Sequence, residues 1–545
     1  MTDQTVILPA RILHTLDPDH RGDAVAVRDG FITGVGTRAD LEAANPDAVI
    51  DERYRDTVVV PGFVEAHSHL LAGAFWAHTY VGWFDRRDPD GRVWPGCRSI
   101  EDVVARLTEA HEKLTDPDAP LIAWGLDPIY FPGDRLVARH LDAVSTTRPV
   151  LVMHASIHLC TVNSVVMRAE GIDRHTAMEG VAKDAGGEPV GELQEAAMLL
   201  AGAPFLAAFG ALADPAAIER FGALATRAGI TTLTDLGGGP SSETDLQRWL
   251  DVAGTDEFPA RVSVFTNPAF GGPSGAGLAA AMVERVARST AKVRFGGVKL
   301  ILDGSIQGFT ARLTEPYLGD HPNGLWLLAP DQVSEAVRSA LEPGLLLHVH
   351  CNGDEAVDVL LEACAEVLPA GGVGDHRTTV QHCQLTRPDQ YERMAELGLC
   401  ANLFSNHLWY WGDQHVELTV GPERAAGMNA ARRVLDLGIP LSVHSDAAVT
   451  PLGPLHVAWC AVNRVTPSGR VLGPEQRITV PEAMHAITLG AAHQLRMDDE
   501  IGSITPGKRA DLAVLGDDPF AVDPAALREV PVLGTVLGGR HHSAA

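Results

Sequence analysis

The stretch at residues 58–69, VVVPGFVEAHSH, joins an apolar run to a pair of histidines. Its β-branched residues before a Pro-Gly turn are typical of a buried strand. His67 and His69 stand at positions i and i+2, which point to the same face of a strand. Two imidazoles placed in this way can bind one metal ion, although surface or core histidines show the same spacing. The stretch therefore predicts a strand that ends either in a metal site or in packed histidines.

Seven further apolar runs alternate with helical patterns through the middle of the chain, which is typical of βα units around a parallel sheet. Several runs end at an ionisable residue, where a strand serving only the core would more simply pass into a turn. We therefore expect a catalytic edge at the ends of these strands. The runs are ITTLTDLG (230–237), RVSVFTN (261–267), GGVKLILDG (296–304), LLLHVHCNGD (345–354), TTVQHCQL (378–385), LCANLF (399–404) and IPLSVHSDA (439–447).

Four single residues close or follow these runs: Lys299, His350, His382 and Asp446. Each alone is consistent with packing, because buried histidines are commonly hydrogen-bonded and a lysine can extend its amine to the surface. A buried ammonium would cost several kcal/mol unless it were paired or lost its charge. Lys299 is therefore expected either to react with carbon dioxide, which makes a carboxylate that can bridge two cations, or to pair with Asp303 or another acid.

The two ends of the chain share a pattern of short strands and turns, which predicts one small β-domain built from both ends. We expect its N-terminal part at 1–62 and its C-terminal part at 496–545, with the catalytic part at 63–495 between them. Residues at about 75–220 fit the βα pattern poorly, because they contain helical stretches such as SIEDVVARLTEAHEKL (99–114) and Gly-rich connections. They are interpreted as an insertion beside the catalytic edge.

The net charge of −27, from 43 basic and 70 acidic residues, disfavours partners with phosphate backbones or anionic lipid surfaces. The seven cysteines include no CxxC pair, which argues against a disulfide framework and for a reducing compartment. We find no signal peptide and expect no run of about 18 uninterrupted apolar residues, so secretion and membrane spanning are not predicted. The protein is expected to be cytoplasmic, with no nucleic-acid or membrane partner.

Together these motifs resemble the amidohydrolase superfamily, in particular the branch that contains N-substituted formamide deformylase and the YtcJ-like proteins. The resemblance rests on five motifs in the same order, which span nearly the whole chain. They are PGFVEAHSH with a lysine on a middle strand, HVHCNGDEAVD, VQHCQL, SVHSDAAVTPLGPL and the closing GSITPGKRADLAVL. The resemblance implies an α/β fold, a distorted (β/α)8 TIM barrel flanked by a small β-sandwich from both termini, and a homodimer.

The resemblance also implies a ligand set for one or two divalent metals, zinc first, with manganese, iron, cobalt or nickel as alternatives. Carbon dioxide would be a second cofactor if Lys299 is carbamylated. Two residues depart from the family pattern, since Glu65 stands where many members have Asp and Gln381 where they often have Glu. Both are expected to alter hydrogen bonding around the ligands. The implied metal ligands are His67, His69, Lys299, His350, His382 and Asp446.

A family member of this kind would hydrolyse a C-N bond of a small organic molecule, in an amide, N-formyl compound, carbamate or cyclic amide. A bound metal lowers the pKa of water from about 15.7 toward about 7 and polarises the substrate carbonyl. Asp446 would act as general base and acid, with Lys299 and His382 completing the catalytic set. Decarboxylation or hydration, ester hydrolysis and a non-catalytic scaffold are the alternatives, because fold and ligands do not determine the reaction.

Four further residues are candidates for contact with substrate. His158 resembles an insertion histidine near the substrate, and His407 follows another predicted strand, so either can orient a carbonyl. Trp409 and Trp411, in HLWYWGDQH, can form an aromatic wall beside an apolar or aryl substrate. Each of the four is equally consistent with a packed side chain.

Overall fold

The computed structural model describes residues 4–545 except 132, 134, 238, 241, 269–274 and 369–373. The centre of this described part is a curled sheet of eight parallel strands in the order β22-β21-β20-β19-β18-β17-β16-β7. Each of the eight predicted runs contributes one strand, so the expected α/β fold with a parallel sheet is confirmed. The strands are β7 (Phe63–Val64), β16 (Ile230–Asp235), β17 (Arg261–Thr266), β18 (Val293–Ile301), β19 (Leu346–Cys351), β20 (Thr379–His382), β21 (Cys400–Leu403) and β22 (Leu441–Val443).

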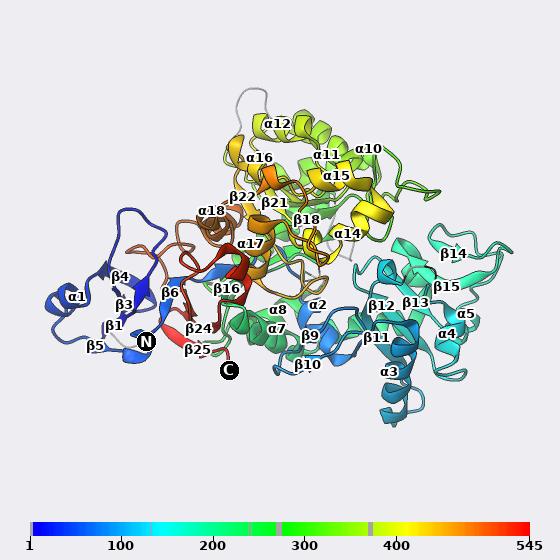
Figure 1. Ribbon diagram of the computed structural model, residues 1–545, viewed down its shortest axis with the longest axis horizontal. Coiled ribbons are helices and arrows are strands. Elements are labelled where there is room, and N and C mark those ends of the chain that lie inside the picture. Colours follow the sequence, from blue (N-terminus) through cyan, green and yellow to red (C-terminus); the bar gives the residue numbers. More distant parts are fainter. Residues whose placement is uncertain are drawn as a thin grey trace.

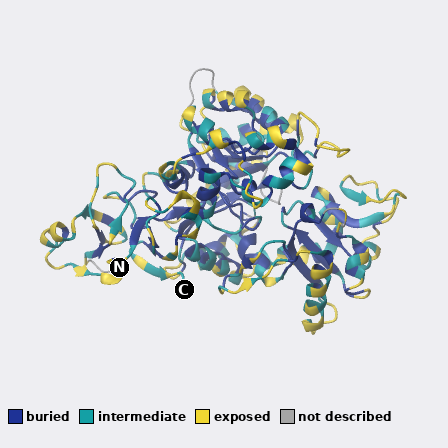
Figure 2. Cartoon of the chain, in the orientation of Figure 1, coloured by how far each residue is buried: buried dark blue, intermediate teal, exposed yellow. Residues whose placement is uncertain are grey.

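Amphipathic helices connect these strands and cover the sheet (Figure 1). In α10 (Pro330–Leu341), for example, Val333, Val337 and Ala340 are buried at helical spacing and acidic residues face the solvent. Figure 2 shows the same pattern around the sheet, with dark blue strands inside and yellow helix faces outside. The other helices that join or cover the strands are α7 (Pro215–Arg227), α8 (Glu243–Ala253), α9 (Ala276–Ala287), α11 (Asp354–Val367), α12 (Pro388–Glu396), α16 (Ala431–Asp436), α17 (Pro454–Asn463) and α18 (Val480–Ala486).

The two edge strands of the sheet, β7 and β22, meet beyond their C-terminal ends. Ser68 and Ala447 form a parallel bridge, the amide of His69 donates to Ala447 at 2.7 Å, and the amide of Asp446 donates to His67 at 3.1 Å. Residues far apart in the sequence are thereby brought to one edge of the fold. The backbone itself therefore holds the HxH motif beside the last-strand aspartate.

Two smaller sheets lie at the end of the molecule where the N-terminus is found (Figure 1). One has the order β4-β3-β1-β5, and the other, β2-β6-β23-β24-β25, combines strands from both ends of the chain. Leu8, Val25, Val59, Leu512 and Val536 belong to one buried cluster, so the two sheets share a core. The strands are β1 (Val6–Pro9), β2 (Ile12–Leu13), β3 (Ala24–Arg28), β4 (Phe31–Gly36), β5 (Val49–Ile50), β6 (Val58–Pro61), β23 (Leu512–Leu515), β24 (Val532–Leu537) and β25 (Arg540–Ser543).

The residues interpreted as an insertion contain a six-stranded sheet in addition to helices. The expected helix is present as α3 (Ile100–Lys113), which begins with a capping box between Ser99 and Asp102. The sheet, at the opposite end of Figure 1 from the N-terminal strands, was not predicted. Its strands, in sheet order, are β14 (Val181–Lys183), β15 (Pro189–Gln194), β13 (Leu159–Val162), β12 (Val150–His154), β11 (Leu121–Leu126) and β8 (Thr79–Tyr80).

One helical segment of the described chain, Glu195–Ala213, is long and apolar enough to cross a membrane by length and composition. Residues 196–213 include no charged or strongly polar side chain, so the expectation that such a run is absent was wrong. Leu199 and Leu206 are 65% and 69% exposed, and the segment passes through η4 (Glu195–Ala201) and α6 (Gly202–Gly210). Length and composition alone are weak evidence for a span, and the lack of a membrane partner stays a prediction.

Candidate metal centre

Three of the predicted ligands, His67, His69 and Asp446, have ligand atoms within 4.8 Å of one another. Asp446 Oδ1 lies 2.9 Å from His69 Nε2 and 3.5 Å from His67 Nε2, and its Oδ2 lies 3.7 Å from His382 Nδ1. The four residues follow or end three different strands and are brought together at the C-terminal edge of the sheet. Burial raises the pKa of the Asp446 carboxyl, but the hydrogen bond from His69 and nearby positive groups outweigh it and lower the pKa.

The backbone at two of these residues lies in the left-handed region, with φ of 74° at His382 and 51° at Asp446. Such a conformation costs roughly 1–3 kcal/mol for a residue with a side chain. It persists where the surrounding structure requires it, and it is concentrated at functional sites. Here it turns both side chains toward the same small volume at the end of the sheet.

A fifth residue, His444, joins the centre and was missed in the sequence. Its Nε2 lies 3.1 Å from His382 Nδ1, and the ligand atoms of His67, His382 and His444 lie within 4.8 Å of one another. His444 and Asp446 repeat the i and i+2 spacing of His67 and His69, so the same rule applied to SVHSDA identifies it. His382 Nε2 is buried without a hydrogen-bond partner. Imidazole nitrogens and a carboxylate, with one nitrogen left unsatisfied, fit a divalent ion such as zinc.

Lys299, on β18, is buried and its Nζ lies 3.4 Å from His67 Nε2. Burial lowers its pKa to about 7, because the interior disfavours the ammonium. The carboxylate of Asp303, the alternative partner proposed from the sequence, instead accepts backbone amides, including those of Asn352 at 3.0 Å and Gly353 at 2.8 Å. The amine of Lys299 therefore points to His67 in the centre.

His350 lies beside these groups, with its ring centroid 4.4 Å from that of His382. Its Nε2 lies 3.0 Å from Asn352 Nδ2 and 3.2 Å from the carbonyl oxygen of Gly304. His350 therefore borders the centre. The loop after β18, which His350 contacts at Gly304, also lines a neighbouring cavity.

The two residues that depart from the family pattern both hold neighbours of the centre in place. Gln381 Oε1 accepts from His67 Nδ1 at 2.6 Å, which leaves His67 Nε2 directed at Asp446 and Lys299. Glu65 accepts from the hydroxyl of Ser445 at 2.7 Å, and burial raises the pKa of its carboxyl to about 8. Both residues act through hydrogen bonds to residues of the centre or their neighbours.

The four substrate-contact candidates lie in different places. His158 is close to the centre, since its ring centroid is 5.6 Å from that of His350. His407 is buried, and its Nδ1 is hydrogen-bonded to His415 Nε2 at 3.0 Å. Trp409 packs edge-on against Trp459 in α17.

Trp411 is also buried, and its Nε1 donates to Asp127 Oδ2 at 2.6 Å. Asp127 lines a cavity beside the centre, so Trp411 lies behind the cavity wall. The structure thus brings His158 to the centre and Trp411 to the cavity. It places His407 and Trp409 in packed surroundings.

Known proteins resemble the chain along almost its whole length. The putative amidohydrolase YtcJ of Bacillus subtilis is 27% identical, over 96% of each chain. N-substituted formamide deformylase of Arthrobacter pascens is 26% identical, over 95% of this chain and 94% of the relative.

The solved structure of an uncharacterised metal-dependent hydrolase from Pyrococcus horikoshii shares the fold, with a TM-score of 0.71 at 19% identity over 99% of this chain and 100% of that one. The model of the Amidohydrolase family matches residues 55–541, which is most of the chain. With the order of the motifs and the convergence of their histidines and aspartate, this match places the chain in the amidohydrolase family.

Proposed function

We propose that this protein is a metal-dependent hydrolase that cleaves a C-N bond of a small organic substrate: an amide, N-formyl compound, carbamate or cyclic amide. The observation that carries the proposal is the convergence of His67, His69 and Asp446 where the two edges of the sheet meet. Membership of the amidohydrolase family and the likeness to a formamide deformylase support the same class of reaction.

The side chains of the centre have the following proposed roles. One or two divalent ions, zinc first, would be held by His67, His69, Lys299, His350, His382 and Asp446, with His444 beside them. When bound, the metal supplies a Lewis acid for water and the substrate carbonyl.

Asp446 would take a proton from the attacking water and give it to the nitrogen that leaves as the C-N bond breaks. His158, oriented by its neighbours, would face the substrate carbonyl.

The test is a hydrolysis screen with metal-replete protein on formamides, aryl amides, carbamates, lactams and esters, alongside Asp446→Asn. We expect turnover of at least one C-N substrate, and a loss in Asp446→Asn of roughly 10²- to 10⁴-fold in kcat. Asp436→Asn, on the exposed side of α16, is the matched control. Near-normal activity of Asp446→Asn would remove the proposed base, and carbon dioxide released without an amine would favour a lyase.

We further propose that the curled sheet forms a distorted (β/α)8 barrel and that the terminal sheets form a β-sandwich. The bridge between Ser68 and Ala447 supports the first proposal, and the shared buried cluster supports the second. The division at 1–62, 63–495 and 496–545, a homodimer and a cytoplasmic location stay predictions. Purified full-length protein analysed by light scattering would test the homodimer.

Lys299 is proposed to be carbamylated in the active protein. Its buried amine lies against His67. Because a buried positive charge is costly, reaction of the neutral amine with carbon dioxide, which replaces that charge with a carboxylate, is favoured. Protein incubated with ¹³C-labelled bicarbonate and zinc should show a carbamate carbon signal by NMR, and Lys299→Met should lack it. The same signal in Lys299→Met, or none in the wild type, would contradict the proposal.

A further inference from the structure

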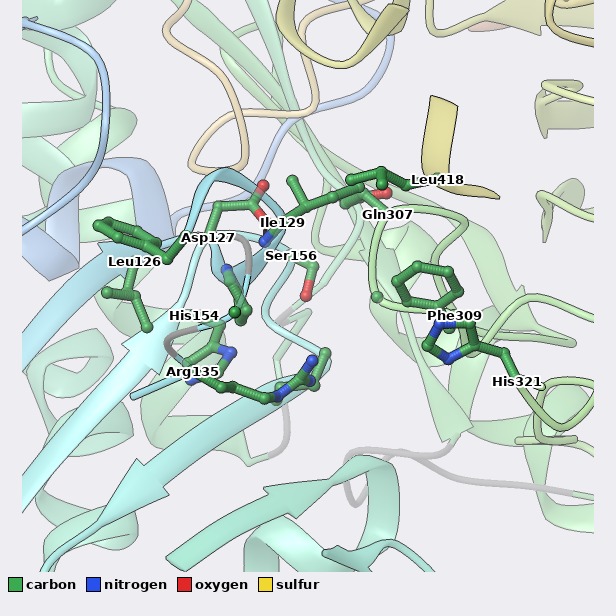
Figure 3. Close-up of a pocket in the computed structure, with 15 residues that line it drawn as sticks. Leu126, Asp127, Ile129, Arg135, His154, Ser156, Gln307, Phe309, His321 and Leu418 are labelled. Carbon is green, nitrogen blue, oxygen red and sulfur yellow. Dashed lines mark hydrogen bonds between the residues drawn. The ribbon is translucent and has the colours of Figure 1, made fainter. Parts of the chain in front are cut away.

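A cavity of about 460 Å³ lies next to the candidate metal centre. This volume falls within the range typical of small-molecule sites. The insertion contributes one wall and the loop after β18 contributes another. Figure 3 shows Asp127, His154 and Arg135 on one side and Phe309 and His321 on the other. The described lining residues include none of the proposed metal ligands, so the cavity is a neighbour of the centre and not the centre itself.

Two short segments connect the cavity to the centre. Ser156 and Leu159 line the cavity and flank His158, whose ring lies beside that of His350. On the other side, Gly304 contacts His350 through its carbonyl and begins the loop that carries Gln307 into the cavity wall. The cavity and the centre therefore adjoin each other through these two segments.

Among the described residues of the lining, two buried polar atoms have no hydrogen-bond partner: His154 Nδ1 and Gln307 Oε1. His154 is 1% and Gln307 4% exposed. The other nitrogen of His154 is already bonded to Thr161 Oγ1 at 2.8 Å. Because buried polar groups are normally paired, these two atoms indicate a ligand that completes them. Gln307 Oε1 only accepts, so the ligand must offer it an N–H or O–H group.

The rest of the lining favours a flat, apolar and uncharged group. The rings of Phe309 and His321 are stacked, with centroids 3.9 Å apart and planes 17° apart. Leu126, Ile129 and Leu418 add aliphatic surface.

The two charged side chains of the described lining, Arg135 and Asp127, already have hydrogen-bond partners. The guanidinium of Arg135 is paired with Glu192, with Nη2 2.7 Å from Oε1. The carboxylate of Asp127 accepts from Trp411. An anionic substituent would therefore meet an arginine whose charge Glu192 already neutralises and a carboxylate, Asp127, that repels it.

We propose that this cavity binds the part of the substrate that lies away from the reacting C-N bond, and that this part is an uncharged aryl group bearing one hydrogen-bond donor. The donor would be bound by Gln307 and His154, and the ring would lie against Phe309. This inference rests on the proposed function, because it names the substrate class of the same enzyme.

The test compares N-(4-hydroxybenzyl)formamide with its 4-methoxy and 4-carboxy analogues. Their binding to metal-replete Asp446→Asn protein is measured by calorimetry, so that no turnover is needed. We expect the hydroxyl compound to bind roughly 5- to 10-fold more tightly than the methoxy compound, which offers no donor, and the carboxylate to bind most weakly. Adding Gln307→Leu should abolish the preference. Adding Gln247→Leu, at an exposed pair with Asp251, is the control and should keep it.

A second variant tests the cavity at an exposed residue, so that the result does not depend on replacing a buried side chain. Leu418 is 40% exposed and lines the cavity, so Leu418→Trp should narrow it without disturbing the core. In the active enzyme it should raise KM for N-benzylformamide by about 10-fold and leave KM for N-methylformamide unchanged.

Equal binding of the hydroxyl and methoxy compounds, no binding of any of the three, or equal effects of Leu418→Trp on both formamides would overturn the inference. Absence of turnover of every formamide by the wild type counts against the proposed reaction alone, because the binding series is read without turnover.

Discussion

Glu195 Oε2 lies 2.8 Å from His158 Nδ1, and the backbone amide of Glu195 donates to the carbonyl oxygen of His158 at 2.8 Å. Glu195 reaches this position with φ of 49°, at the start of the apolar segment Glu195–Ala213. Burial lowers the pKa of His158, but the carboxylate of Glu195 outweighs it and the pKa is raised. The insertion thus holds one imidazole, in a fixed orientation, beside His350.

Glu195 should therefore act as a positioning residue for His158. We expect Glu195→Gln to lower kcat roughly 10- to 100-fold with unchanged zinc content, because the imidazole loses its charged acceptor. Glu195→Asp should recover part of the activity if a carboxylate is what matters. Glu188→Gln, on the exposed hairpin between β14 and β15, is the control. A Glu195→Gln enzyme with normal kcat would mean that the contact serves packing only.

Gln381 should control how tightly the centre binds metal. Its Oε1 accepts from His67 Nδ1, which fixes the tautomer in which His67 Nε2 carries a free lone pair. Gln381→Leu is expected to weaken zinc binding roughly 10- to 100-fold, measured by competition with a chromogenic chelator. Gln332→Leu, exposed on α10, should bind as the wild type does. Unchanged affinity in Gln381→Leu would exclude His67 as a ligand oriented in this way.

Metal binding should also stabilise the folded chain, since the ligands come from distant parts of the sequence. At zinc concentrations 100 times the dissociation constant, the gain is about 2.7 kcal/mol for one site. Dialysis against a chelator should therefore lower Tm, and added zinc should restore it. His444→Asn is expected to reduce this zinc-dependent shift. A Tm that is the same with and without metal would contradict a bound ion.

The parallel sheet could be predicted because strands buried on both faces leave runs of apolar and β-branched residues, such as Ile230–Asp235 in β16. The sheet in the insertion could be predicted only in part, because its strands β11 (LIAWGL) and β12 (VLVMH) are apolar runs that were overlooked. Its returning strands β14 and β15 carry Gly, Lys and Pro and show no such run. The run at 196–213 was readable from composition and was overlooked.

At the site, sequence spacing carries information only between neighbours. His67 and His69 were recognisable as a pair, and the same rule would have identified His444 with Asp446. Glu195 offered no such signal, because it is an isolated acid 37 residues from the histidine it holds. Gln307 lies in a loop and becomes notable only because the fold leaves its oxygen buried and unpaired.

Acid should weaken the insertion through Glu192. Burial raises the pKa of its carboxyl, but the hydrogen bonds and charge of Arg135 outweigh burial, so the folded pKa lies below the ordinary value of 4.5. A depressed folded pKa stabilises the protein above about pH 4.5, and that stabilisation is lost as pH falls through the folded pKa. The difference in unfolding free energy between wild type and Glu192→Gln should therefore shrink below pH 4.5, measured with urea on metal-free protein. A difference that stays constant with pH would contradict this.

Arg261 on β17 joins the central sheet to the C-terminal part of the chain. Its Nε lies 2.6 Å and its Nη2 3.1 Å from the two oxygens of Asp511, with side chains only 5% and 1% exposed. Arg261→Leu would leave the Asp511 carboxylate buried without its cation, and we expect a loss of about 3–5 kcal/mol in unfolding free energy.

Replacing both residues with leucine should recover most of this loss, because neither charge then remains buried. Arg38→Leu removes one partner of an exposed pair with Glu52 and should cost about 1 kcal/mol or less. Urea unfolding is measured for the wild type, Arg261→Leu, the double variant and Arg38→Leu. It distinguishes a loss of charge neutralisation at Asp511 from a loss of packing by the arginine. If the double variant is as unstable as Arg261→Leu, the arginine contributes through packing and its bond to Ala291 rather than by neutralising Asp511.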